Sequence, residues 1–210
     1  SAPQRSSPLA PRAPTPTGAS PFVPEQAAPS SAVRVLVLAA AAIFGFTFFA
    51  MELVWYRVLA PLTGGTVYGF ALVLMVALAG IGLGGLAYEL RRPQRPGLQH
   101  LALSAAIEAT AIVFAWGLGD QVPMFAAQLR AITILGTAAA HASAMVLSAA
   151  LVLPAALVAG YQFPLLVACL GRGTAQVSAH VGRAYAINTV GAVVGAIATG
   201  FGLLSLVGVR

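Results

Sequence analysis

Lysine is absent from this chain and acidic residues are scarce. Its 210 residues include eleven arginines and five acidic residues, and only 8% of the residues are charged. A soluble domain of this size needs more polar side chains to cover its surface. With 59% hydrophobic residues and a mean hydropathy of +0.90, the composition excludes an ordinary soluble protein. It predicts an all-α integral membrane protein.

Cysteine is almost absent as well. Cys169 is single, so the chain cannot form an internal disulfide, and no second thiolate is present for a metal site. We expect Cys169 to fill an apolar position. His100, His141 and His180 show neither an HxxxH pattern nor a carboxylate at ligand spacing, so we predict solvated or interfacial histidines, no metal site and no cofactor.

The basic stretches have few aromatic residues. Despite the net charge of +6, this composition argues against nucleic acid as a partner. Arginine stays protonated, and it suits the boundary between lipid headgroups and water as well as ion pairs. The lipid bilayer is therefore the first partner that we expect.

Proline divides the chain at about residue 32. Eight of the fourteen prolines fall within residues 1–32, which predicts a disordered Pro/Ser/Ala-rich tail, retained on the cytoplasmic side. Residues 33–210 form the predicted transmembrane helical domain. About 20 apolar residues cross a bilayer, which gives five spans at about residues 33–51, 67–88, 101–119, 144–170 and 184–209.

Two regions between these spans are harder to divide. The sequence Pro61–Gly65 predicts a turn after the first span. Residues 131–171 carry no formal charge and are too many for one ordinary span, so we expect an interfacial or tilted helical approach followed by one span, with six spans in all as the alternative.

The arginines favour five spans. With a cytoplasmic N-terminus, eight arginines fall on the cytoplasmic side and three on the outer side: Arg5, Arg12, Arg34, Arg91, Arg92, Arg95, Arg172 and Arg183 against Arg57, Arg130 and Arg210. This is the positive-inside bias expected of a multi-pass protein of the bacterial inner membrane. A sixth span would turn Arg172 and Arg183 outward and weaken that bias.

Two glycine pairs have the spacing of helix contacts. Gly80 and Gly84, and likewise Gly191 and Gly195, are four residues apart, which allows helix backbones to approach closely in lipid. Residues 80–85 also fit a dinucleotide-binding pattern, but they lie inside an apolar span without a preceding strand. We therefore predict helix packing at both pairs.

Pro154, Gly160 and Pro164 interrupt the fourth predicted span. Such residues produce either a static kink that serves packing or a hinge. Both interpretations remain open from the sequence, although proline and glycine are common in membrane helices and favour the static kink.

Three polar residues lie deep in different spans. Counting about 1.5 Å per residue from the cytoplasmic ends places Glu108, Gln162 and Asn188 in one layer. They form either a substrate or proton site or an interhelical hydrogen-bond cluster. By the same count Glu52 lies near the outer face, so we do not expect it to pair with Glu108.

The segment around Glu52 looks like an outer-face anchor. Trp55 and Tyr56 fit an interfacial aromatic belt, and Arg57 can either reach the outer headgroups or meet Asp120. Glu52 and Arg57 are five residues apart and do not share a helix face, so we expect Glu52 to turn inward.

Several of these pieces occur in a characteristic order, namely Met51–Arg57, Gly64–Tyr68, Gly80–Gly84, Glu108, Gly160–Pro164 and Arg183–Gly195. Over about residues 40–210 the ordered set resembles the membrane part of the fused transporter-like (MFS)/spermidine synthase-like family. The resemblance implies a polytopic bundle joined to a C-terminal cytosolic aminopropyltransferase-like or methyltransferase-like domain. The present chain stops before any βαβ pattern, so we expect no enzyme in it.

Two function classes follow. The first is a non-catalytic accessory or scaffold subunit that packs with a larger membrane-protein assembly. The second, which follows from the resemblance, is the membrane part of a fused polyamine aminopropyltransferase or small-cation transporter whose cytosolic enzyme domain lies beyond this chain. Such a module would admit or move a small cationic or amphipathic molecule, with Glu108 as the cation-binding carboxylate. Five spans without an evident inverted repeat are few for a complete transporter, which favours the accessory role.

Overall fold

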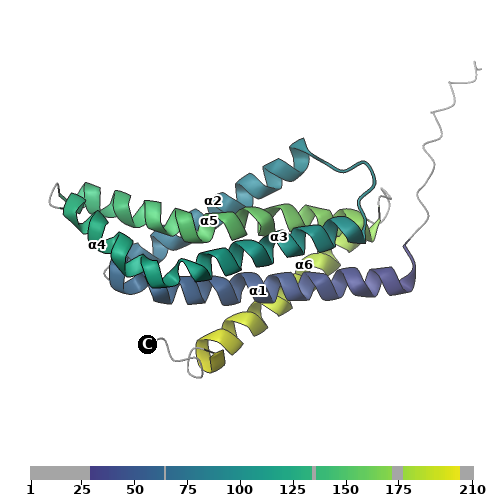
Figure 1. Cartoon of the computed structure of the whole chain (residues 1–210). Coiled ribbons are helices and arrows are strands. Elements are labelled where there is room, and N and C mark those ends of the chain that lie inside the picture. Colours follow the sequence, from purple (N-terminus) through teal and green to yellow (C-terminus); the bar gives the residue numbers. More distant parts are fainter. Residues whose placement is uncertain (1–28, 64, 134–135, 172–176, 204–210) are drawn as a thin grey trace, which may run out of the picture.

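The computed structural model describes residues 29–63, 65–133, 136–171 and 177–203 (Figure 1). These ranges contain helices and no strand. In chain order the helices are α1 (Ser31–Thr63), α2 (Val67–Leu90), α3 (Leu98–Gly117), the 3₁₀ turn η1 (Gly119–Gln121), α4 (Val122–Thr133), α5 (Thr137–Leu170), α6 (Val177–Ile197) and the π-helical segment η2 (Ala198–Leu203). Most of the predicted tail, residues 1–28, lies outside the described residues.

Five helical segments are long and apolar enough to cross a membrane, namely Ser31–Pro61, Val67–Leu90, Leu98–Gly117, His141–Leu170 and Val177–Gly202. The prediction of an all-α protein with five such helices is confirmed for the described ranges. Among the described residues between 119 and 171, α5 is the one helix long enough to cross. The 12 residues of α4 are too few for a sixth span.

The first helix is longer than predicted, and the turn expected to start at Pro61 starts later. α1 continues through Pro61 to Thr63. Pro61 lacks the N–H that would bond to the Arg57 carbonyl, and because it lies in the last turn only two helical residues follow this interruption. Gly65 then adopts a left-handed conformation with φ of 62°, and its N–H donates to the Ala60 carbonyl over 2.6 Å. This bond satisfies a carbonyl that the helix end would otherwise leave unpaired.

The last helix begins earlier than predicted. α6 starts at Val177 rather than near residue 184, and η2 extends it to Leu203. The third helix is shifted slightly, to Leu98–Gly117. The second matches its prediction closely and begins at a capped turn, where the Thr66 hydroxyl oxygen accepts a hydrogen bond from the Gly69 N–H. Residues 204–209 of the predicted fifth span lie outside the described residues.

The long helices alternate in direction along the bundle (Figure 1). α2 packs mainly against α5, whereas α6 packs mainly against α1. α3 lies on α5, and α1 also contacts α5. The bundle therefore contains two closely packed helix pairs, α2 with α5 and α1 with α6, which meet where α1 contacts α5.

Glycines allow the close approach of α2 and α5. A Cβ atom added at Gly80, Gly84 or Gly160 would lie closer than 3.0 Å to atoms of the opposite helix. For Gly80 the nearest atom is the Ala156 Cβ, at 2.5 Å, and for Gly160 it belongs to the Ile81 backbone. Side chains larger than hydrogen would push the two backbones apart.

The crossing of α1 and α6 is built in the same way. An added Cβ at Gly191 would overlap the backbone of Ala42, and one at Gly195 would overlap that of Phe46. Gly45 of α1 faces the backbone of Asn188 in return. The structure thus places both predicted glycine pairs at helix crossings.

α5 runs as one helix through Pro154 and Pro164. Gly160, which the sequence grouped with these prolines in a kink or hinge, lies at the crossing with α2. The small residue therefore has a packing role that does not depend on bending of the helix.

Two apolar clusters form the core. The first contains Trp55 and Leu59 of α1, Val73 of α2 and Val152 of α5, and the second contains Val37 of α1 and Leu165 of α5. Large apolar side chains also cover much of the outside, among them Val67, Phe114, Trp116, Val190, Val193 and Phe201. An apolar exterior of this kind suits a bilayer environment.

Candidate functional site

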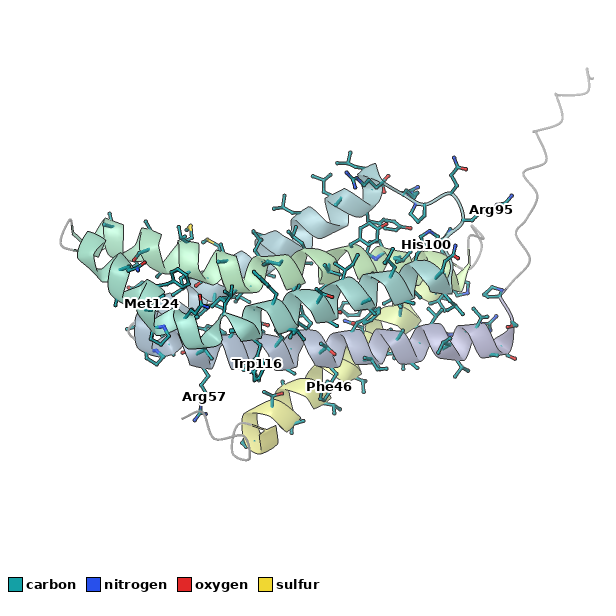
Figure 2. The ribbon with its side chains drawn as sticks, in the orientation of Figure 1. Phe46, Arg57, Arg95, His100, Trp116 and Met124 are labelled. Atoms are coloured by element: carbon teal, nitrogen blue, oxygen red, sulfur yellow. The ribbon has the colours of Figure 1, made fainter. Side chains whose placement is uncertain are left out.

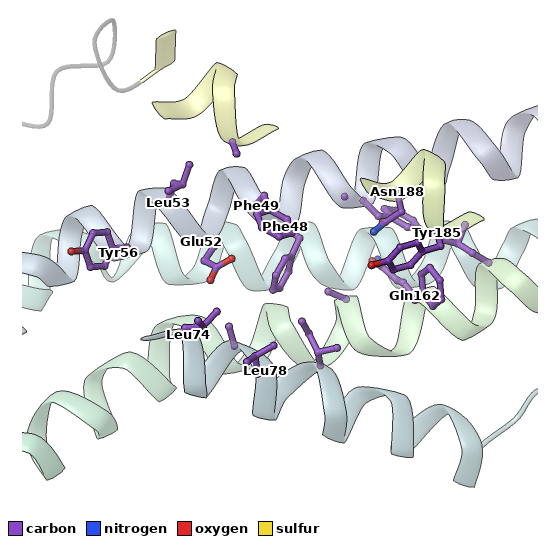
Figure 3. Close-up of a pocket in the computed structure, with 18 of the residues that line it drawn as sticks. Phe48, Phe49, Glu52, Leu53, Tyr56, Leu74, Leu78, Gln162, Tyr185 and Asn188 are labelled. Atoms are coloured by element: carbon purple, nitrogen blue, oxygen red, sulfur yellow. The ribbon is translucent and has the colours of Figure 1, made fainter. Parts of the chain in front are cut away.

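A cavity of about 720 Å³ lies between α1, α2, α5 and α6 (Figure 3). It occupies the space between the two closely packed helix pairs. Its wall is mainly apolar. The polar side chains in the wall are Glu52 and Tyr56 from α1, Gln162 from α5, and Tyr185 and Asn188 from α6.

Aromatic rings make up much of this wall. Seven aromatic side chains line the cavity, namely Phe44, Phe48, Phe49, Tyr56, Phe70, Phe163 and Tyr185. The rings of Tyr56 and Phe70 meet edge to face with centroids 5.1 Å apart, and those of Phe163 and Tyr185 do so at 6.3 Å. The negative faces of aromatic rings attract cations, and such rings favour quaternary ammonium groups.

Glu52 is the acidic residue of the wall. Its side chain is 9% exposed, and it forms no hydrogen bond or ion pair with another described residue. Figure 3 shows its carboxylate between α1 and the side chains of Leu74 and Leu78. A carboxylate in such surroundings requires a proton, water or a cation to compensate for its lost hydration.

The other two members of the predicted outer-face anchor lie in different surroundings. Trp55 is 3% exposed and packs in the first apolar cluster, so its assignment to an interfacial belt is wrong. The reason is its position on α1, where it faces the other helices rather than lipid. Arg57 is exposed, and Figure 2 shows it pointing away from the bundle.

Glu108 and Gln162 contact each other directly. The Gln162 Nε2 donates a hydrogen bond to the Glu108 Oε2 over 2.9 Å. Both side chains are buried, at 3% and 1% exposure. Along α3, Glu108 lies between Leu101 of the second apolar cluster and Ala115 of the first. The hydrogen bond is therefore a polar contact between the two apolar clusters.

Asn188, the third residue of the predicted layer, has another environment. It lines the cavity with Gln162, and Figure 3 shows the two with Tyr185 at one end of the cavity, away from Glu52. Its side chain forms no hydrogen bond with Glu108 or Gln162 within the described part. Glu108 is absent from the cavity wall. Gln162 is therefore the residue that joins the buried carboxylate to the cavity.

The histidines and the cysteine form no metal centre. Within the described ranges, no group of three histidine, cysteine, aspartate or glutamate side chains is placed to hold a metal ion. His180 is 9% exposed and lies against Gly171, so the expectation of a solvated or interfacial side chain is wrong for it. Because α6 begins at Val177, His180 falls inside the helix and against the end of α5. Cys169 is buried, as predicted.

The aromatic cavity was missed from the sequence, although one signal was available. Phe44, Phe48, Glu52 and Tyr56 are spaced four residues apart and share one face of α1. A stripe of aromatic residues that contains a carboxylate differs from the aliphatic stripes of the other spans. It marks the face of α1 that lines the cavity.

Comparisons with known proteins add no relative. No protein-family model, no curated protein and no solved structure matches the chain.

Proposed function

We propose that this protein is a membrane module that binds a small amphipathic cation in the cavity between its two helix pairs. The observation that carries the proposal is Glu52, a carboxylate without a partner among the described residues, in a cavity lined by seven aromatic side chains. The carboxylate supplies the opposite charge, and the rings supply apolar area and cation–π attraction. Glu52 therefore takes the role that the sequence had suggested for Glu108.

Anionic ligands fit this cavity poorly. A phosphate or carboxylate group would be repelled by Glu52, and the described residues that line the wall include no arginine. The ligand that we propose carries one ammonium group on a compact apolar body. Such a group can come from a free amine or from the headgroup of a lipid, and the experiment separates these sources.

The test uses benzyltrimethylammonium as the probe and the purified full chain in phosphatidylglycerol nanodiscs. We expect saturable binding, and we expect Glu52→Gln to raise the Kd at least tenfold, equivalent to about 1.4 kcal/mol. Glu89→Gln is the matched control, because Glu89 is exposed and paired with Arg92. Neopentylbenzene, the neutral isostere, should bind without any effect of Glu52→Gln.

Two outcomes refine or reject the proposal. If phosphatidylethanolamine added to the nanodiscs displaces the probe, a lipid headgroup is the source of the ammonium. If the probe binds equally to wild type and Glu52→Gln, or no better than to empty nanodiscs, the cation site does not exist.

A second candidate is the accessory or scaffold role in a larger membrane assembly. It is supported by Gly182 and Ala186 of α6, which are exposed and four residues apart, with open space beside Gly182. This spacing of small residues suits contact with a further helix. A photo-crosslinker at Val181 should capture one defined membrane protein, and Gly182→Leu should abolish that product. Gly82→Leu, at an equally open position of α2, should leave the product unchanged.

For location, the proposal is the bacterial inner membrane with a cytoplasmic N-terminus. Figure 2 shows Arg95 toward one end of the bundle and the exposed Arg57 toward the other. Arg34 lies in the first turn of α1, and Arg91 and Arg92 follow the last turn of α2; these two helix ends lie on the side of Arg95 (Figure 1). This asymmetry supports the orientation by the positive-inside rule. The ordered motifs keep the fused MFS/spermidine synthase-like family as the proposed origin of the module.

A further inference from the structure

The hydrogen bond between Glu108 and Gln162 leaves one oxygen of each side chain without a partner. Glu108 Oε1 and Gln162 Oε1 are both inaccessible to solvent, and neither has a hydrogen-bond partner. Their other polar atoms are joined by the bond from Nε2 to Oε2 at 2.9 Å. Burying a polar atom without a partner costs on the order of 1–3 kcal/mol, so two such atoms on adjacent side chains call for an explanation.

An ionised Glu108 does not provide that explanation. Its charge would lie between two apolar clusters with a single neutral donor, and α3 packs against α5 and α1. The described titratable or charged side chains of these two helices are Arg34, Glu52, Tyr56, Arg57, His141, Tyr161 and Cys169, and α3 itself adds His100. None of these side chains forms a hydrogen bond or ion pair with Glu108; within the described part of the chain, Glu108 is hydrogen-bonded to Gln162. An uncompensated carboxylate in this position would be very costly.

A proton on Glu108 removes both difficulties at once. If Oε1 carries the proton, its O–H can donate to the Gln162 Oε1, while the Gln162 Nε2 continues to donate to Oε2. The acid and the amide then form a closed pair with two hydrogen bonds, and each oxygen that now lacks a partner becomes the partner of the other. The pair is neutral, as its apolar surroundings require.

We infer that Glu108 and Gln162 form an intramembrane proton-binding site, in which Glu108 holds the proton and Gln162 closes the pair. Gln162 also lines the cavity, so the proton lies one side chain behind the cavity wall. The site does not depend on any ligand in the cavity. It can therefore be tested on the protein alone.

Infrared spectroscopy of the purified full chain in nanodiscs at pH 7 tests this inference. A protonated carboxyl has a C=O stretch that is separate from the carboxylate bands and shifts in D₂O. We expect such a band in the wild type, its loss in Glu108→Gln, and its retention in Glu52→Gln and Glu89→Gln. Glu108→Gln should fold, because two amides can form the same doubly bonded pair.

A second measurement makes the test independent of that substitution. Labelling the chain with ¹³C-glutamate should shift the same band in the wild type. Gln162→Met should move it to higher frequency, because the carbonyl loses the amide donor. If the wild type and Glu108→Gln have the same protonated-carboxyl region and a carboxylate band is lost instead, Glu108 is ionised and the inference is wrong.

Discussion

The crossing of α2 and α5 gives a prediction with a matched control two residues away. Gly84 and Gly82 both lie within α2, but they face different surroundings. A Cβ added at Gly84 would lie 2.9 Å from both the Leu157 carbonyl carbon and the Tyr161 nitrogen, which are backbone atoms that cannot rotate away. A Cβ added at Gly82 would meet nothing within 4 Å. Alanine at position 82 should therefore leave the folded protein stable, whereas alanine at position 84 should destabilise it.

The magnitude follows from the difference between the two variants. Replacing glycine by alanine inside a helix gains about 1 kcal/mol from conformational preference. This gain applies to both variants and cancels when they are compared. Overpacking of a tight contact costs about 1–3 kcal/mol. Gly84→Ala should therefore be less stable than Gly82→Ala by about 1–3 kcal/mol, and each 1.4 kcal/mol changes the unfolding equilibrium about tenfold.

The free energy of unfolding can be measured by reversible titration with sodium dodecyl sulfate in mixed micelles, with circular dichroism as the readout. Gly82→Ala should be as stable as the wild type or more stable. Equal stability of the two variants would refute the close backbone contact of α2 with α5. A loss of stability in Gly82→Ala alone would show that the other face of α2 forms the contact.

Two further predictions concern orientation. The first uses variants that keep one tryptophan each, with brominated lipid as a quencher of tryptophan fluorescence. In Trp55→Phe the remaining Trp116 is 75% exposed and should be quenched strongly, whereas in Trp116→Phe the remaining Trp55 is 3% exposed and should be quenched weakly. Equal quenching of the two variants would contradict the burial of Trp55. In a Cys169→Ser background, a membrane-impermeant maleimide should label Gln94→Cys from the cytoplasmic side and Gln121→Cys from the outside; the opposite pattern would reverse the proposed topology.

The number and order of the helices could be predicted because composition and chain length constrain them directly. Some boundaries could not. Pro61 indicates that a helix is ending but does not fix the last residue, and α1 continues two residues beyond it to Thr63. The separation of α4 from α5 falls in a run without charge or proline, next to Gly136, which adopts φ of 111°. A single glycine among many does not identify such a break in the sequence.

The sequence predicts the level of the site residues along the helices, but it does not predict the direction in which their side chains point. Counting residues along the spans places Glu108 and Gln162 at one level, and the structure brings these two side chains into contact. Whether Asn188 joins them or Trp55 faces lipid depends on the rotation of each helix about its axis and on the helix crossings. Contacts between helices, such as that of Gly45 with the backbone of Asn188, set both the rotations and the crossings. A local sequence pattern does not predict such contacts.

The two glycine crossings have a mechanical consequence. Within each pair, backbone meets backbone through glycine, so neither pair can change its internal spacing without breaking many contacts. The cavity lies between the pairs, where the wall consists of side chains. The glycine crossings thus fix the spacing within each pair, whereas the contact between the pairs, including the apolar clusters that α1 shares with α5, is made by side chains.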